Sequence, residues 1–340
     1  MTALQPIEII GGGLAGLSLG LALRRSGVPV TLIEAGRYPR HRVCGEFITG
    51  LSATTIARLG LEPFLTDALQ HREIAWFQRE KLIRVQHLPS PALGLSRYAL
   101  DSRLASAFTA AGGVLQANTR VESLAPAPGR VLATGRSRGD STWIGLKLHA
   151  HGLTLARDLE LHLGDDAYVG LATVETGAVN LCGLFRRRAI AENGPALVIA
   201  YLHATGLSSL ATRLAASQPD PASLCAVAAL NFTPTPTAPG TIRLGDAHAL
   251  IPPFTGNGMA LAFQSAEAAL APLLAYARGA TSWVDTCQTA HTAICRRFRV
   301  RLGAANALHP FLLRPHRQRW LATLTRAHLL PLRPLYNLLH

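Results

Sequence analysis

The chain is poor in lysine: Lys81 and Lys147 are its two lysines, and the other 31 basic residues are arginines. The formal net charge of +13 is of the kind that attracts nucleic acid. No helix-turn-helix, zinc-finger spacing or aromatic-basic RNA signature accompanies this charge, although a nucleic-acid reader should show one of them. We therefore expect no nucleic-acid partner.

Spacings that bind metal or form disulfides are also missing. The five cysteines are odd in number and contain no CxxC pair, which disfavours a disulfide framework and a zinc site. No two histidines follow the HxxxH spacing of a helical metal site. The sequence thus predicts no metal, and the scattered cysteines favour a reducing cytoplasm.

Long hydrophobic runs are absent as well. No uninterrupted apolar run reaches about 18 residues, so a transmembrane span is not expected. The first 25 residues lack the basic start of a secretory signal and are broken by glycines. With 49% hydrophobic and 16% charged residues over 340 positions, the chain predicts a globular protein of two subdomains.

The N-terminal segment has the pattern of a βαβ unit. A β-branched run at 7–10 is followed by the glycine turn GGGLAG, and a helical pattern extends to Arg25. Residues 28–33 have the pattern of a second buried strand, which Glu34 closes. This context predicts a dinucleotide site, with Glu34 accepting a hydrogen bond from a ribose hydroxyl. A carboxylate there disfavours a 2′-phosphate, so an ADP moiety is expected.

Each glycine of this turn has a physical use. Gly11 permits the tight turn, Gly13 lets a pyrophosphate approach the backbone, and Gly16 lets helix and strand pack closely. At Leu14 and Ala15 the helix begins, and its unpaired N–H groups and partial positive charge favour phosphate.

A second glycine site, GDAHALIPPFTGNG at 245–258, distinguishes FAD from NAD. An aspartate at a strand end, here Asp246, can bind ribityl hydroxyls, which NAD lacks. The helix that follows offers N–H donors where a reduced flavin collects negative charge. The predicted cofactor residues of this site are Asp246, Pro253, Gly256, Asn257, Gly258 and Met259.

Taken together, these motifs resemble the FAD-dependent monooxygenase and geranylgeranyl reductase superfamily, whose fold is similar to that of para-hydroxybenzoate hydroxylase. The matching stretches are GGGLAG with Glu34, RYPRHRVCGEF, SRYALDSRLASAF and GDAHALIPPFTGNGMALA. The tryptophan-rich signature of flavin halogenases is absent, which disfavours halogenation.

The resemblance implies roles for further residues. Arg97 would contact FAD, the backbone of Val121 would lie beside the adenine, and Cys44 and Gly45 would lie near the isoalloxazine ring. Cys44 is also a candidate reacting group, although a packed loop residue is the alternative. Arg42, like Arg40, is expected to neutralise FAD phosphate, to receive an acidic substrate, or to be an exposed charge. His248 is a second catalytic candidate, with a structural hydrogen-bonding role as its alternative.

The predicted fold is α/β, with a Rossmann-like FAD-binding domain, an antiparallel-sheet substrate domain and a C-terminal helical segment. The short alternating segments that begin between 133 and 174 predict the antiparallel sheet. The sequence also predicts a strand in the Val121 region, a helix over 195–217 and a Pro/Thr-rich linker at 233–239. The predicted FAD-binding domain comprises 1–70, 92–132 and 240–280. The substrate domain comprises 71–91 and 133–239, and the helical region comprises 281–340.

The predicted function is FAD-dependent oxidation. A monooxygenase would hydroxylate an apolar aromatic, polyketide-derived or isoprenoid molecule through a flavin C4a-hydroperoxide. The alternatives are a flavin-dependent reductase of isoprenoid double bonds and a non-catalytic flavin-binding partner.

The sequence also gives expectations for the electron donor and for the C-terminal region. NAD(P)H or a separate reductase would supply electrons, although Thr134 stands where the family has an acid implicated in pyridine-nucleotide binding. No acid follows Asp285, so the C-terminal region is basic and amphipathic. It predicts either contact with an anionic membrane surface or a helical cap over the substrate domain.

Overall fold

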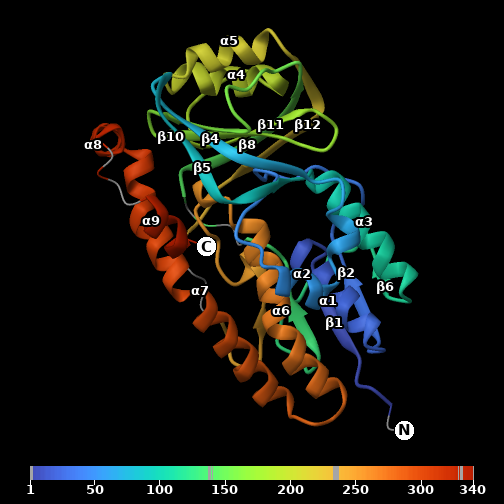
Figure 1. Cartoon of the computed structure of the whole chain (residues 1–340). Helices are drawn as coiled ribbons and strands as arrows, with labels where there is room; N and C mark the ends of the chain where they lie inside the picture. Colours follow the sequence, from blue (N-terminus) through green and yellow to red (C-terminus); the bar gives the residue numbers. More distant parts are fainter. Residues whose placement is uncertain are drawn as a thin grey trace.

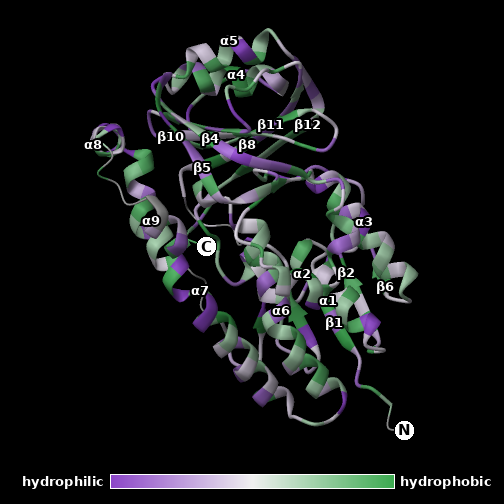
Figure 2. Cartoon of the chain, viewed as in Figure 1, coloured by the Kyte–Doolittle hydropathy of each residue, from purple (hydrophilic) through white to green (hydrophobic). Residues whose placement is uncertain are grey.

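The computed structural model describes residues 3–136, 139, 141–232, 237–327, 329 and 332–339. Figure 1 shows two β-sheets, one above the other in this view, with a long helix running along one side. Figure 2 shows green, hydrophobic residues on the helices and strands of both sheets.

The smaller sheet is parallel and contains the predicted βαβ unit. β1 and β2 pair from Ile7 opposite Val30 to Ile10 opposite Ile33. Parallel strands covered by helices on both faces carry continuous apolar runs, which explains their Ile- and Val-rich sequences. The strand order is β13-β7-β1-β2-β6. The bounds are β1 Ile7–Ile10, β2 Val30–Ile33, β6 Val114–Gln116, β7 Arg130–Leu132 and β13 Ile242–Arg243.

Helices cover this sheet and form one apolar core with it. α1 is buried from Leu14 to Leu23. The hydroxyl of Ser96 accepts from the Ala99 N–H at 3.1 Å and so caps α3. The helices are α1 Leu14–Arg25, α2 Ala53–Leu59, α3 Arg97–Ala110 and α6 Gly258–Ala277, with short 3₁₀ turns η1 Glu62–Phe64, η2 Gly245–Ala247 and η3 Pro253–Thr255.

The larger sheet is mainly antiparallel, in the order β12-β8-β11-β10-β9-β4-β5-β3. Leu146, Leu148 and Ala150 of β8 pack into the apolar cluster with α4 and α5. Because side chains alternate along a strand, Lys147 and His149 face the other way, toward the parallel sheet. The strands are β3 Phe47–Ile48, β4 Leu69–Gln78, β5 Lys81–Gly94, β8 Trp143–His151, β9 Leu159–Gly164, β10 Ala167–Thr173, β11 Val179–Arg186 and β12 Gln218–Ala228.

The C-terminal segment is helical, as predicted. α7 spans Trp283–Leu313, α8 Pro315–Arg326 and α9 Leu332–Leu339. α6 is long and apolar enough by length and composition to cross a membrane, but 56% of its most apolar window is buried in the fold. It packs against α1 and α7, as a core helix does. The predicted fold class is thus confirmed, while the domain boundaries stay predictions.

Three local predictions were wrong or incomplete. The Val121 region contains no strand. The helix predicted over 195–217 is two helices, α4 Gly194–Ala204 and α5 Ser208–Ala215, because Gly206 between them adopts φ +75°. β12 was missed because prolines at 219 and 221 disfavour a strand, yet it pairs with β8 through a register shift between 220 and 225. Of the predicted linker at 233–239, residues 233–236 lie outside the described residues.

Candidate functional site

A cavity of about 780 Å³ lies between the two sheets. Its lining includes both glycine turns, at 11–16 and 245–258, together with side chains of the larger sheet such as Tyr168 and Cys182. The fold therefore brings the two predicted turns to one space. The predicted residues that line it are Gly11, Gly13, Leu14, Ala15, Glu34, Arg42, Cys44, Gly45, Arg97, Val121, Asp246, Pro253, Gly256, Gly258 and Met259.

The first turn has the shape that a phosphate cradle needs. Gly11 has φ +109°, and a Cβ there would lie 2.2 Å from the Ala133 carbonyl oxygen. A Cβ on Gly16 would lie 2.0 Å from the Gly11 oxygen, so Gly16 permits close packing of α1 on β1 although it does not line the cavity. A Cβ on Gly13 would have no atom closer than Nη2 of Arg97, at 3.8 Å. This open space at the start of α1 fits a pyrophosphate.

Glu34 ends β2 and is largely satisfied by the protein. Its carboxylate accepts from the N–H of Gly12 at 2.7 Å, the N–H of Gly36 at 2.8 Å and Arg40 at 2.8 Å. Burial would raise the pKa of Glu34, but Arg42, Arg40 and these N–H groups lower it overall. Besides the Gly12 N–H, Oε2 of Glu34 has only Nη2 of Arg42 near it among its charged partners, at 3.5 Å. Oε2 can therefore accept one further hydrogen bond, from a ribose hydroxyl.

Arg97 and Arg42 are held by one buried carboxylate. Asp101, which is fully buried, accepts from Nε of Arg97 at 2.7 Å and from Nε of Arg42 at 2.8 Å. Arg42 also donates to the Gly12 carbonyl at 3.3 Å. Because their partner fixes both guanidinium groups at the cavity wall, they offer positive charge to a bound diphosphate without a large ordering cost.

The second turn presents a carboxylate for which no described residue is a hydrogen-bond donor. Asp246, in η2, lines the cavity, and among the described residues none donates a hydrogen bond to its carboxylate. Burial raises its pKa, while Arg136 and Arg97 act in the opposite direction. A partly buried acceptor that no described residue pairs suits the hydroxyls of a ribityl chain. This geometry, the open space at Gly13 and the cavity size together fit FAD.

Two predicted residues lie elsewhere. His248 does not line the cavity; its ring packs edge-on against His291 of α7, with centroids 6.2 Å apart. Asp246 and Leu250, two positions away on either side, line the cavity, whereas the His248 ring lies against α7. Asn257 is also absent from the lining: its Nδ2 donates to the Leu339 carbonyl at 2.5 Å, and its Oδ1 accepts from Thr49 at 3.1 Å. Asn257 thus connects the start of α6 to Thr49, the residue after β3, and to α9.

Cys44 lines the cavity, but its thiol is not activated. Its Sγ accepts from the Glu46 N–H at 3.4 Å, and its carbonyl oxygen accepts from Asn180 at 3.0 Å. Burial raises the pKa of the thiol, so it stays protonated near pH 7. This favours the packed loop residue over the reacting group.

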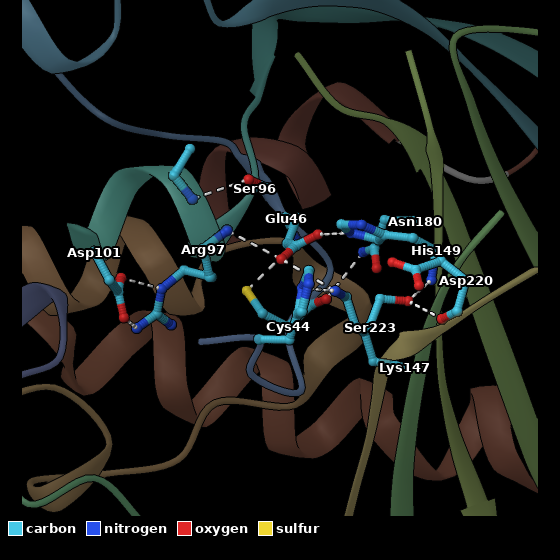
Figure 3. A network of polar contacts seen from close by, with 12 residues as sticks. Cys44, Glu46, Ser96, Arg97, Asp101, Lys147, His149, Asn180, Asp220 and Ser223 are labelled. Carbon is cyan, nitrogen blue, oxygen red and sulfur yellow. Dashed lines mark hydrogen bonds and ion pairs between the residues drawn. The ribbon is translucent and has the colours of Figure 1, made fainter. Parts of the chain in front are cut away.

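A buried polar network that the sequence patterns did not predict lies beside Cys44 (Figure 3). Glu46 lies at its centre with φ +57° and is fully buried. Its carboxylate contacts Nε2 of His149 at 2.5 Å and Nζ of Lys147 at 3.6 Å, and accepts from the Arg97 N–H at 3.0 Å. The available signal was Lys147-Leu-His149, which places two polar side chains on one face of a buried strand.

This network fixes the loop beside the cavity to the larger sheet. Burial would raise the pKa of Glu46, but His149 and Lys147 lower it overall, so the carboxylate stays ionised. Nζ of Lys147 also lies 2.9 Å from Nδ1 of His41, which lines the cavity. Ligand atoms of His41, Glu46 and His149 lie within 4.8 Å of one another, but the Lys147 ammonium already occupies the acceptor of His41, so we assign no metal there.

Comparison with known proteins agrees with this geometry. Residues 5–147 match the family model described as FAD binding domain. Menaquinone reductase of Mycolicibacterium smegmatis is 24% identical over 166 residues, which cover 47% of this chain and 41% of the relative. The match thus spans less than half of that relative's length.

Solved structures resemble the whole chain. PqsL of Pseudomonas aeruginosa, described as a probable FAD-dependent monooxygenase, aligns with a TM-score of 0.71 at 16% identity, covering 93% of this chain and 98% of PqsL. A geranylgeranyl bacteriochlorophyll reductase-like protein of Thermoplasma acidophilum aligns with a TM-score of 0.73 at 17% identity, covering 94% and 91%. At these identities the likeness shows the shared fold.

Proposed function

We propose that this chain is an FAD-dependent oxidoreductase, most simply a monooxygenase of a small apolar molecule, because residues 5–147 match the family model described as FAD binding domain and the fold resembles that of PqsL. The observation that carries the proposal is the meeting of both glycine turns at one cavity. Neither turn by itself distinguishes FAD from another dinucleotide, but a diphosphate cradle and an open carboxylate on one cavity suit FAD.

The residues of this chain have separate tasks in that function. The start of α1 with Gly13, together with Arg42 and Arg97, would hold the diphosphate, and Asp246 would hold the ribityl chain. Bound FAD would supply the electron transfer and oxygen chemistry. The larger sheet would exclude water, because its cavity-facing side chains include Leu161, Tyr168 and Leu184.

The first experiment identifies the cofactor and then the reaction. The chain, purified as it is expressed, should show a flavin absorbance spectrum and release FAD on denaturation. Reduced with dithionite and mixed with oxygen, it should convert an apolar test substrate to a product that carries one added oxygen atom. A chain without flavin that also fails to take up added FAD contradicts the proposal.

A reductase of double bonds is the second candidate. The sequence match to menaquinone reductase and the structural match to the reductase-like protein favour it. Anaerobic turnover with dithionite-reduced flavin, giving a product with two added hydrogens and no added oxygen, would establish it in place of the monooxygenase.

The electron donor and the partners of the chain also remain proposals. NAD(P)H or a separate reductase would reduce the flavin, and Thr134, which lines the cavity, supplies no carboxylate for a pyridine nucleotide. Anaerobic mixing with NADPH and with NADH, followed by flavin absorbance, distinguishes direct reduction from the need for a separate reductase.

A further inference from the structure

A second pocket, of about 460 Å³, opens at the surface beside α7. It shares Leu230 and Phe232 with the inner cavity. Its lining residues are Ser141, Trp143, Leu230, Asn231, Phe232, Asn306, His309 and Pro310. Since two residues face both spaces, the outer pocket and the cavity are separated by a single layer of side chains.

That layer is aromatic. The Tyr168 hydroxyl lies 3.2 Å from Nε2 of His309, and the Phe232 ring packs edge-on against His309 with centroids 4.7 Å apart. The Phe254 ring lies nearly parallel to His309, at 6.1 Å. Tyr168 and Phe254 line the inner cavity, whereas His309 lines the outer pocket. Flat rings that make few hydrogen bonds can separate by rotation about their side-chain bonds without breaking backbone structure.

The lining of the outer pocket carries no charged side chain among the described residues, in a chain with a net charge of +13. His309 is neutral at physiological pH, because burial lowers its pKa to about 4. A charged group that enters this pocket would lose part of its hydration without gaining an ionic partner from the described lining. Ser141 and Asn306 offer neutral hydrogen-bonding groups, so the pocket suits an uncharged molecule.

We propose that the outer pocket is the access port of the inner cavity and the outer half of its ligand site. The ligand is an uncharged amphiphile. Its apolar body passes between Leu230 and Phe232 toward Tyr168, and its hydroxyl or carbonyl end stays beside Ser141 and Asn306. This rests on the proposed function only in placing the flavin in the inner cavity.

A matched pair of probes tests the charge requirement: 1-dodecanol and dodecanoate have equal chains and differ in charge. Titrated by calorimetry into the flavin-loaded chain, below the aqueous solubility of dodecanol and the critical micelle concentration of dodecanoate, dodecanol should bind at least about tenfold more tightly. Asn306→Lys should improve dodecanoate binding by at least about fivefold, because it supplies the missing ionic partner. Equal affinities of the two probes would overturn the proposal.

Bulky substitutions test the route. Leu230→Trp and, more conservatively, Phe232→Trp narrow the passage and should each weaken dodecanol binding by about tenfold or more. Leu82→Trp, at a position 53% exposed on β5, is the matched control and should change nothing. Circular dichroism establishes folding; unchanged dodecanol affinity in a folded Phe232→Trp variant contradicts the route. Flavin content measured on the same samples tests the proposed function separately.

Discussion

At the scale of single residues, the site depends on the space that the missing side chain of Gly13 leaves in the cavity and on the carboxylate of Asp246. Gly16 and Gly13 belong to one motif but act differently. A side chain on Gly16 would collide with backbone, whereas one on Gly13 would enter the cavity. The first supports the fold, and the second keeps space for a ligand.

Gly13→Val should therefore abolish flavin retention while preserving the fold. Gly13 has φ −88°, so the new side chain meets no backbone strain. It occupies the space of the diphosphate, and we expect flavin content to fall by about tenfold or more. Absorbance and circular dichroism of the purified variant measure both effects. Gly303→Ala, with nothing within 4 Å of the added methyl, is the control and should keep its flavin.

Asp246→Asn should weaken flavin binding and stabilise the flavin-free chain. The pKa of Asp246 is raised, so the folded state holds its proton to higher pH than the unfolded state, and stability falls as pH rises through this window. Above the unfolded pKa the wild-type chain bears this loss of stability, whereas asparagine, which carries no titratable group, does not. Thermal melts of flavin-free protein and flavin titration measure the two effects. A lower melting temperature with unchanged flavin affinity would contradict both assignments.

At the scale of elements, β8 contributes to two faces with opposite chemistry. Leu146 and Leu148 hold the α4 and α5 layer, while Lys147 and His149 hold the loop of Glu46 and Cys44. One strand thus connects the outer helices to the cavity wall.

Lys147→Met should destabilise the chain by about 3–5 kcal/mol, because it removes a cation from a fully buried carboxylate. The double variant Lys147→Met with Glu46→Gln should recover part of this loss, since no unpaired charge remains. Urea unfolding of the wild type, both single variants and the double variant gives the coupling free energy. Additive losses would show that Lys147 and Glu46 do not act as a pair.

At the scale of the whole molecule, buried histidines make the fold sensitive to acid. Burial lowers the pKa of His309 to about 4, and burial with Lys147 and His149 does the same for His41. Between about pH 6.5 and pH 4 these histidines bind protons in the unfolded chain but stay neutral in the folded chain. The free energy of unfolding therefore falls as pH falls through this range. Glu34 and Glu46, with lowered pKa values, add a further loss below about pH 4.5.

His309→Gln should flatten this acid dependence. From pH 7 to pH 5 the variant should lose about 2 kcal/mol less unfolding free energy than the wild type. His41, which is partly exposed, contributes less because solvent screens it. Urea denaturation at the two pH values is the measurement, and identical losses in wild type and variant would contradict the assignment. His203→Gln, on an exposed histidine, is the control.

The sequence by itself determined the local geometry: the βαβ unit, the glycine turns and the strand-to-helix frame of Asp246. These depend on neighbours a few residues apart, because steric and hydrogen-bonding demands of a turn act over that range. Tertiary structure decided what no local pattern contains. The register of β8 against β11 and β12 brought Lys147 and His149 to Glu46, and the packing of α7 brought His309 to Tyr168. Such contacts join residues about a hundred positions apart, and their partners become known only when the whole core is packed.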